Sequence, residues 1–261
     1  MKVGAAFVCS LLLGSASLAS AQPTPVSEGQ QVLLACAQTY HSLQEFKGSA
    51  AVVSQSSING AISLSNANAD FDFVRGQHFD IGGYDSSHDA YSITSTPQKT
   101  TTKWALFGKE QVETARDVSS AVASFTGVAG LAPTTIPALL LETSYKYPFD
   151  TNMPATLKPS ETFGGHLCFV VSQQTVKRPG NDTYWIDAKT FLLRGMREEQ
   201  ENYSFKIPKT GDEADKKLPD EEVKVAFSSR LHVFSIEQTL PTEVDLQAAA
   251  RRIAFPAFNA R

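Results

Sequence analysis

Apolar and polar positions alternate along most of this chain, and the alternation predicts β-strands. Phe71 and Phe73 flank an aspartate, and Leu167, Phe169 and Val171 alternate with smaller residues. A period of two residues is typical of a strand with one buried face. Such strands recur at short intervals with turn residues between them. The sequence therefore predicts an antiparallel sheet of about nine to eleven strands.

The clearest alternation lies between residues 166 and 199 and predicts a three-stranded meander. Its strands are expected over Leu167–Val171, Tyr184–Ile186 and Phe191–Arg197. Asp187 begins the second turn, because an aspartate can bond backbone N–H groups two residues further on. Three glutamates close to the end of the meander predict a solvated strand end and not an acid–base pair: Glu198, Glu199 and Glu201.

Helical spacing of apolar residues predicts one long helix near the start of the chain. Ser27 and Gln30 fit a capping box, and an apolar stripe runs from Leu33 to Phe46. Gly48 is the expected end of the helix. One face of the helix is apolar and the other polar, so we expect it to pack against the sheet on one side.

A segment without charge between Asp117 and Glu142 predicts two short apolar helices interrupted by glycine and proline. The second is expected to begin at Ala138. Because surface loops are seldom this apolar, the segment should cover the concave face of the curled sheet and act as a movable lid. The lid candidates are Val122, Phe125, Val128, Leu131, Ile136, Leu139 and Leu140.

A sheet of this size curls, and the space between its concave face and the helices is a candidate cavity for an apolar ligand. The candidate wall residues are Phe71, Phe73, Phe79, Ile81, Trp104, Leu167, Phe169, Val171 and Trp185. The alternative for each of them is ordinary packing in the hydrophobic core.

The start of the chain predicts a secretory signal peptide. A lysine is followed by a short apolar run and by Ala19-Ser20-Ala21, with cleavage expected near Ala21. The alternative, a membrane anchor, would need about 20 apolar residues. No linker-like stretch divides residues 22–261, so a single exported domain is expected.

The net charge of −4, with no basic patch among aromatic residues, argues against nucleic acid as a partner. The five histidines show no metal-ligand spacing, and the chain has no cofactor motif and no nucleophile–base arrangement. We therefore expect a binding protein and not an enzyme. In an oxidising compartment Cys36 and Cys168 could form a disulfide, or each could pack as a small buried residue.

Several short motifs, in their order along the chain, resemble those of one family. They are Tyr40–Phe46, Phe71–Gly76, Ile136–Leu141, Gly164–Cys168 and Trp185–Arg194. Together they resemble the LolA/LolB-like superfamily of outer-membrane lipoprotein carriers. The resemblance implies an α+β fold, a curved antiparallel half-barrel closed by an N-terminal helix and central lid helices. Arg75 is the possible counterpart of the arginine that locks the lid.

The resemblance also implies a function and its ligands. We expect a periplasmic binding or carrier protein that holds a lipid or the acyl chains of a lipoprotein. The alternative is an envelope regulatory module that contacts a partner protein in the inner or outer membrane. It would do so through the charged segment Pro208–Glu222 or through Arg251-Arg252, and the charged segment departs from the family pattern.

Overall fold

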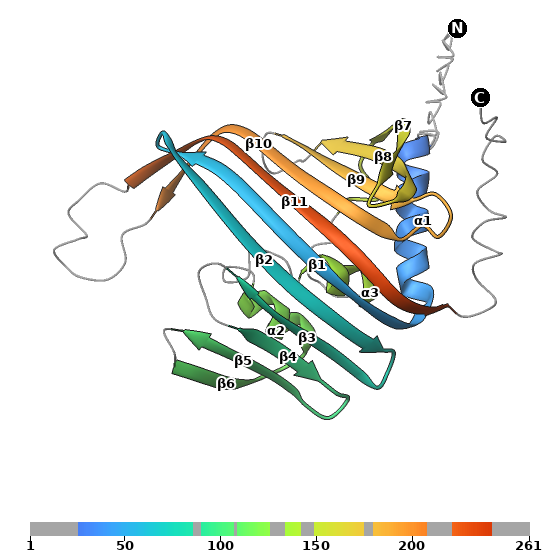
Figure 1. Ribbon diagram of the computed structural model, residues 1–261, viewed down its shortest axis with the longest axis vertical. Coiled ribbons are helices and arrows are strands. Elements are labelled where there is room, and N and C mark those ends of the chain that lie inside the picture. The colour runs from blue at the N-terminus through green and yellow to red at the C-terminus, as the bar shows by residue number, and fades with distance from the viewer. Residues whose placement is uncertain are drawn as a thin grey trace, which may run out of the picture.

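The structure, a computed structural model, describes residues 26–85, 90–106, 109–125, 134–141, 149–174, 180–207 and 221–241. Within these ranges the chain forms helices and strands that are labelled in Figure 1. In chain order they are α1 (Glu28–Ser42), β1 (Leu43–Ile58), β2 (Ala61–Val74), β3 (His78–Asp85), β4 (Tyr91–Ser95), β5 (Thr100–Leu106), β6 (Lys109–Ala115), α2 (Val118–Phe125), α3 (Thr135–Leu140), β7 (Ala155–Phe163), β8 (His166–Gln174), β9 (Asn181–Asp187), β10 (Leu193–Ile207) and β11 (Glu221–Pro241).

The strands form one antiparallel, eleven-stranded sheet in the order β6-β5-β4-β3-β2-β1-β11-β10-β9-β8-β7. Its halves are two meanders of consecutive strands, β1 to β6 and β7 to β11. They join where β1 pairs with β11, from Leu43 opposite Pro241 to Ile58 opposite Val225. The first and last described strands therefore lie side by side at the centre of the sheet.

The helices lie against one face of this curved, open sheet, which we call the inner face (Figure 1). Helix α1 contacts β7, β8 and α3, and α2 contacts β4, β5 and β6. One large buried cluster contains residues from all three helices and from the strands facing them. The expected α+β half-barrel is confirmed, and its strand number falls within the expected range.

The alternation pattern identifies the central meander, now β8, β9 and β10, but it does not reveal β6 and β7. These are the two edge strands of the sheet. Strand β6 is exposed along nearly its whole length. Strand β7 contains Pro159 and a register shift between Lys158 and Glu161. A strand with little buried surface has no apolar alternation, so its sequence resembles that of a loop.

Helix α1 starts as predicted and ends earlier. The Gln30 N–H donates to Ser27 Oγ at 3.3 Å, and the Ser27 N–H donates to Gln30 Oε1 at 3.0 Å, which confirms the capping box. The helix ends at Ser42 and not at Gly48, because Leu43 takes an extended conformation and begins β1 without a loop. Gly48 lies within β1, where a Cβ would come 2.5 Å from a backbone oxygen of β11.

The second predicted helix, α3, begins at Thr135 and not at Ala138. Pro137 lies in its first turn, where backbone N–H groups have no partner within the helix, so proline is tolerated there. The helix ends at Leu140, and all of its residues are buried. It is therefore an internal element of the fold.

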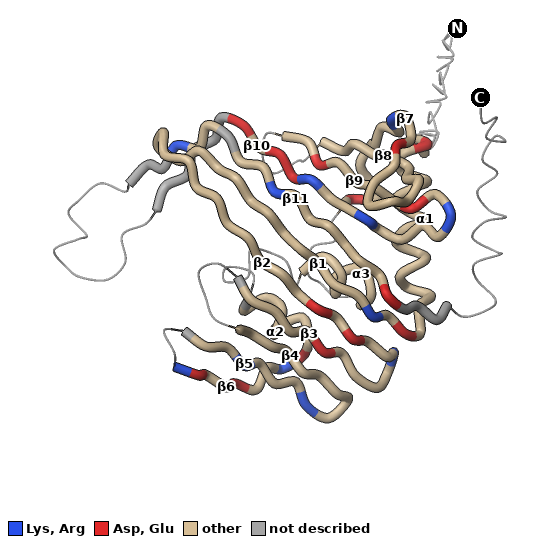
Figure 2. Tube along the Cα trace, viewed as in Figure 1, with Lys and Arg blue, Asp and Glu red and all other residues tan. Residues whose placement is uncertain are grey.

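Strands β1 and β2 form a long hairpin. Its turn consists of Asn59 and Gly60, whose φ angles of 49° and 84° are those of a two-residue turn between twisted strands. Residues 49–69, which span the outer part of the hairpin, contain no charged side chain. Figure 2 shows this part of the hairpin in tan.

Some expectations concern residues outside the described ranges. These are the signal peptide with cleavage near Ala21, the lid positions Val128 and Leu131, most of the charged segment Pro208–Glu222, and Arg251-Arg252. The single domain over residues 22–261 stays a prediction. Within the described chain, none of the helices has the length and apolar character of a membrane span.

Candidate ligand-binding site

Most of the predicted wall residues meet on the inner face. The buried members of the inner-face cluster are Phe71, Phe73, Phe79, Ile81, Phe169 and Val171. Phe73 and Phe79 are opposite each other on β2 and β3, and their rings meet edge to face at 5.6 Å between centroids. Trp104 is partly buried against the same cluster. The sequence thus identified a continuous apolar surface, and the structure shows it packed against helices.

The lid candidates whose side chains are described belong to the same cluster. They are Val122 of α2 and Ile136, Leu139 and Leu140 of α3. Phe125 is the last residue of α2, and its side chain lies outside the described part. The described wall and lid residues therefore belong to one continuous buried cluster.

Two wall candidates lie elsewhere, which corrects the expectation for them. Trp185 is opposite Val170, and both belong to a second buried cluster with Cys168. Side chains alternate between faces along β8, so this cluster lies on the outer face, opposite Phe169. Leu167, at the start of β8, is 56% exposed. The order Tyr-Trp-Ile in β9 is apolar at every position, and it does not indicate which face is buried inward.

Arg75, in the turn between β2 and β3, connects the helices of the inner face to each other. Its Nε donates to the carbonyl oxygen of Leu43 at 2.9 Å. Its Nη2 donates to the carbonyl oxygens of Tyr40 at 3.4 Å and Leu140 at 3.3 Å. The guanidinium carbon lies 5.3 Å from the centre of the Phe73 ring. One side chain thus joins the end of α1, the start of β1 and the end of α3.

The chemistry of these contacts suits a reversible lock. Carbonyl oxygens at the C-terminal end of a helix carry partial negative charge, so a cation is stabilised there. The Tyr40 carbonyl also accepts the N–H of Leu43. Each hydrogen bond from a charged donor contributes about 1.5–3 kcal/mol. If Arg75 released these contacts, neutral carbonyl groups would be exposed and no carboxylate would be left unpaired. The role of Arg75 as counterpart of the lid-locking arginine stays a prediction.

A row of polar side chains crosses the inner face beyond the apolar cluster. Strand pairing aligns Gln173, Asp182, Glu198, Arg230 and Ser54 across β8, β9, β10, β11 and β1. Arg230 Nη1 lies 2.9 Å from Glu198 Oε2, and Arg230 Nε donates to Ser54 Oγ at 3.3 Å. The Glu198 side chain is only 11% exposed, so the expectation of a solvated strand end is wrong for this residue.

His232 lies beside this row and is fully buried between Val52 and Met196 of the neighbouring strands. Its Nε2 is 3.5 Å from Glu198 Oε2, and neither ring nitrogen has a hydrogen bond to the described residues. Burial lowers the pKa of His232; Glu198 raises it in part and Arg230 lowers it further. The imidazole is therefore neutral at pH 7.

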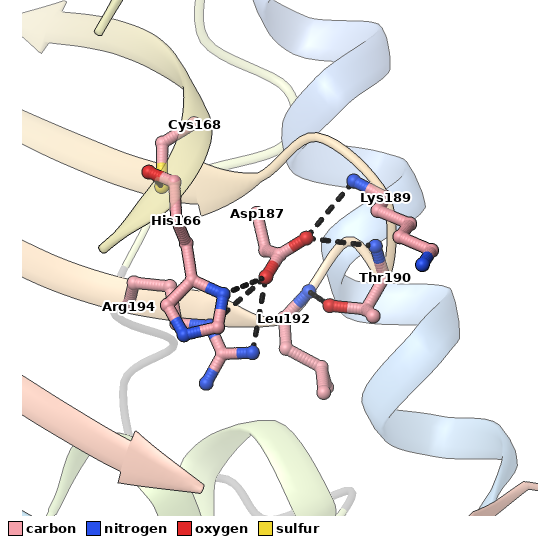
Figure 3. Close-up of polar contacts among 7 residues, drawn as sticks. All are labelled: His166, Cys168, Asp187, Lys189, Thr190, Leu192 and Arg194. Carbon is pink, nitrogen blue, oxygen red and sulfur yellow. Dashed lines mark hydrogen bonds and ion pairs between the residues drawn. The ribbon is translucent and has the colours of Figure 1, made fainter. Parts of the chain in front are cut away.

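Asp187 organises the turn between β9 and β10 (Figure 3). Its Oδ1 accepts the N–H groups of Lys189 at 2.9 Å and Thr190 at 3.0 Å, as the sequence predicted. Its Oδ2 accepts Arg194 Nε and Nη2 at 3.1 and 3.0 Å and lies 3.0 Å from His166 Nδ1. Burial raises the pKa of Asp187, but the hydrogen bonds from Lys189, Thr190 and Arg194 outweigh it, so the pKa is lowered.

Cys168 is next to this group without forming a nucleophile–base pair. Its Sγ donates to the backbone oxygen of His166 at 3.5 Å, while the His166 ring points away from it in Figure 3. Burial, with the negative charge of Asp187, raises the pKa of the Cys168 thiol to about 11. Cys36 is also free, and it lies in the inner-face cluster, so the two cysteines form no disulfide.

Comparison with protein family models returns no match, and neither does comparison with curated proteins. Solved structures do match. An outer membrane lipoprotein-sorting protein domain from Vibrio parahaemolyticus has 10% identity and a TM-score of 0.32, with 88% of this chain and 99% of that chain covered. A LolA superfamily protein from Nitrosomonas europaea has 10% identity and a TM-score of 0.27, with 82% and 94% covered.

A third match is the MucA/MucB complex of Pseudomonas aeruginosa, with 12% identity and a TM-score of 0.39, over 83% of this chain and 59% of that chain. The family that the sequence motifs resemble thus appears among the similar structures. At these TM-scores the superpositions are loose.

Proposed function

We propose that this protein is a periplasmic binding or carrier protein for the acyl chains of a lipid or an acylated lipoprotein. The chains would lie on the inner face of the half-barrel, beneath α2 and α3. The observation that carries the proposal is the contact between Arg75 and the Leu140 carbonyl oxygen. The turn that contains Arg75 donates one hydrogen bond to the helix that covers the apolar wall.

Loading begins when Arg75 releases Leu140 and α3 moves away from the sheet. The wall around Phe73 and Phe79 then accepts an acyl chain in place of the helix. Each buried CH₂ contributes about 0.8 kcal/mol, so a long chain offsets the lost helix contacts. The inner face changes from apolar to polar near Glu198, which suits an amphiphile with its headgroup beside the polar row. Return of α3 to Arg75 displaces the chain.

The proposal is tested by titrating the protein with a fluorescent fatty-acid analogue. The wild type should bind saturably. Val122→Asp puts a carboxylate into the lid contact and should weaken binding at least about tenfold, because an ionised group would be buried there. Val112→Asp is the matched control, since Val112 is exposed on β6 and its change should leave binding intact.

Thermal unfolding shows whether Val122→Asp still folds, and native mass spectrometry of the wild type gives an independent readout. An acylated species that copurifies with the protein supports the proposal. The proposal fails if the wild type neither binds the probe saturably nor carries any acylated species from the cell.

Envelope regulation through a membrane-bound partner stays the second proposed function. Of the surfaces expected for it, most of Pro208–Glu222 and all of Arg251-Arg252 lie outside the described ranges. Deleting residues 208–220 separates the two functions. A carrier should retain the fatty-acid probe after the deletion, whereas a regulator that uses this segment should lose its partner protein.

A further inference from the structure

One fully buried side chain of the inner face, His232, has two polar atoms that the described fold leaves without a hydrogen bond. Buried polar groups are nearly always paired, because an unmet donor or acceptor in the interior costs free energy. An apolar side chain would fit this position between Val52 and Met196 without that cost. The ring nitrogens therefore point to a group that the protein binds at this place.

His232 lies along the inner face from the apolar wall. At one end of this surface Phe46 is opposite Phe73, and at the other Val52 is opposite His232. Ala50 lies between them on the same face and is buried. Strand β1 advances six residues from Phe46 to Val52, or about 20 Å. A long acyl chain that starts on the wall at Phe73 can therefore place its polar end at His232.

The polar row begins immediately beyond His232, and its arginine is already engaged. Arg230 is two residues away on the same strand and face, and its Nη1 lies 2.9 Å from Glu198 Oε2. Its Nε donates to Ser54 Oγ at 3.3 Å. An anionic headgroup would have to compete with Glu198 for this guanidinium. His232 is thus the polar group between the apolar surface and a charge pair that is already formed.

The neighbouring carboxylate determines which ring nitrogen carries the proton. Because burial lowers the pKa of His232, the ring is neutral at pH 7 and has a single N–H. His232 Nε2 lies 3.5 Å from Glu198 Oε2. A negative charge favours an N–H over a lone pair on the nitrogen that faces it, so the proton is on Nε2. Nδ1 is therefore the acceptor, and it can bind only a hydrogen-bond donor.

We propose that His232 Nδ1 accepts a hydrogen bond from the polar end of the bound lipid, and that this end is neutral and carries a donor. The hydroxyl of a glyceride and the amide N–H of an N-acylated chain both have this chemistry. A free carboxylate does not, because it would face a lone pair and the charge of Glu198. The inference rests on the proposed function, since the lipid reaches His232 along the inner face.

The test compares three ligands with the same acyl chain: a methyl ester, an N-methyl amide and a monoacylglycerol. The ester has no donor, whereas the amide has an N–H and the monoacylglycerol has hydroxyls. Each ligand competes with the fluorescent fatty-acid analogue for the wild type and for His232→Phe, which keeps a ring and removes the acceptor. Relative to the ester, at least one donor ligand should bind His232→Phe at least about threefold more weakly, the usual effect of one hydrogen bond. The ligand that loses affinity identifies the source of the donor.

Val52→Ala is the matched control, because Val52 is opposite His232 and has no polar group. It should change the affinity for all three ligands alike. If the affinity ratios are the same in the wild type and in His232→Phe, the inference is wrong. It is also wrong if His232→Phe weakens the carboxylate probe instead, since Nδ1 would then be a donor.

Direct titration with the probe separates this inference from the proposed function. A wild type that binds the probe saturably but shows unchanged ratios keeps the proposed function and loses only the role of His232. A wild type that does not bind the probe contradicts both. Saturable binding of the probe to His232→Phe shows that the variant is folded.

Discussion

Arg75 Nη2 lies 3.3 Å from the carbonyl oxygen of Leu140, 65 residues further along the chain. The same guanidinium donates to Leu43 at the junction of α1 and β1. Arg75 is thus the point where the apolar covering helix, the first helix and the sheet meet. The rate at which α3 leaves the inner face should depend on this one side chain.

Arg75→Met removes the donors and keeps an apolar stem beside Phe73. We expect the fluorescent fatty-acid analogue to associate and dissociate at least about tenfold faster, since the lost hydrogen bond to Leu140 contributes about 1.5–3 kcal/mol. Stopped-flow fluorescence measures both rates. Arg116→Met is the control, because Arg116 is exposed and pairs with its neighbour Asp117. Equal rates in the wild type and Arg75→Met would rule out the lock.

Buried His232 should make stability depend on pH. Burial lowers its pKa below the usual 6.5, so the unfolded chain binds a proton more readily than the folded one. The stability that this site contributes is complete above about pH 6.5 and is lost as the pH falls further. We expect His232→Phe to lose less stability than the wild type between about pH 7.5 and pH 5.

Urea unfolding at the two pH values measures this difference. Val53→Phe is the control, since Val53 is exposed and carries no titrating group. Val53→Phe should keep the wild-type pH dependence of the urea midpoint. If the urea midpoint changes equally between the two pH values in the wild type and in His232→Phe, the prediction is wrong.

Asp187→Asn should destabilise the protein at neutral pH. An asparagine still offers an oxygen to the N–H groups of Lys189 and Thr190, but it leaves Arg194 without its charge partner. We expect a loss of about 1–3 kcal/mol in the free energy of unfolding at pH 7. The pKa of Asp187 is lowered from the usual 3.8, so its contribution is present above that pH and disappears as the pH falls through the folded-state value.

Denaturant unfolding at pH 7 and at about pH 2.5 tests the size of the loss and its dependence on pH. The difference in the free energy of unfolding between Asp187→Asn and the wild type should be smaller at the lower pH. Asp72→Asn breaks the exposed pair with His78 and should cost at most about 1 kcal/mol. If Asp187→Asn loses no more free energy of unfolding than Asp72→Asn, the stability of the turn does not depend on the charge of Asp187.

The sequence predicted an apolar face of the sheet because burial on one face leaves alternation, as at Phe71 and Phe73. It could not place Trp185, because its neighbours Tyr184 and Ile186 are apolar too. It missed β6 and β7 because an edge with little burial leaves no pattern. The sequence also did not predict that Glu198 is buried, because its burial depends on pairing with Arg230 of another strand. Burial of a charged residue depends on partners that are distant in sequence.

The pairing of β1 with β11 has a consequence for how the sheet forms. Each half of the sheet can assemble from hairpins between neighbours in the chain, but Leu43 meets Pro241 only when nearly the whole described chain has been brought together. Closing so long a loop is slow compared with forming the hairpins. The pairing of β1 with β11 should therefore form last, after each half of the sheet has assembled.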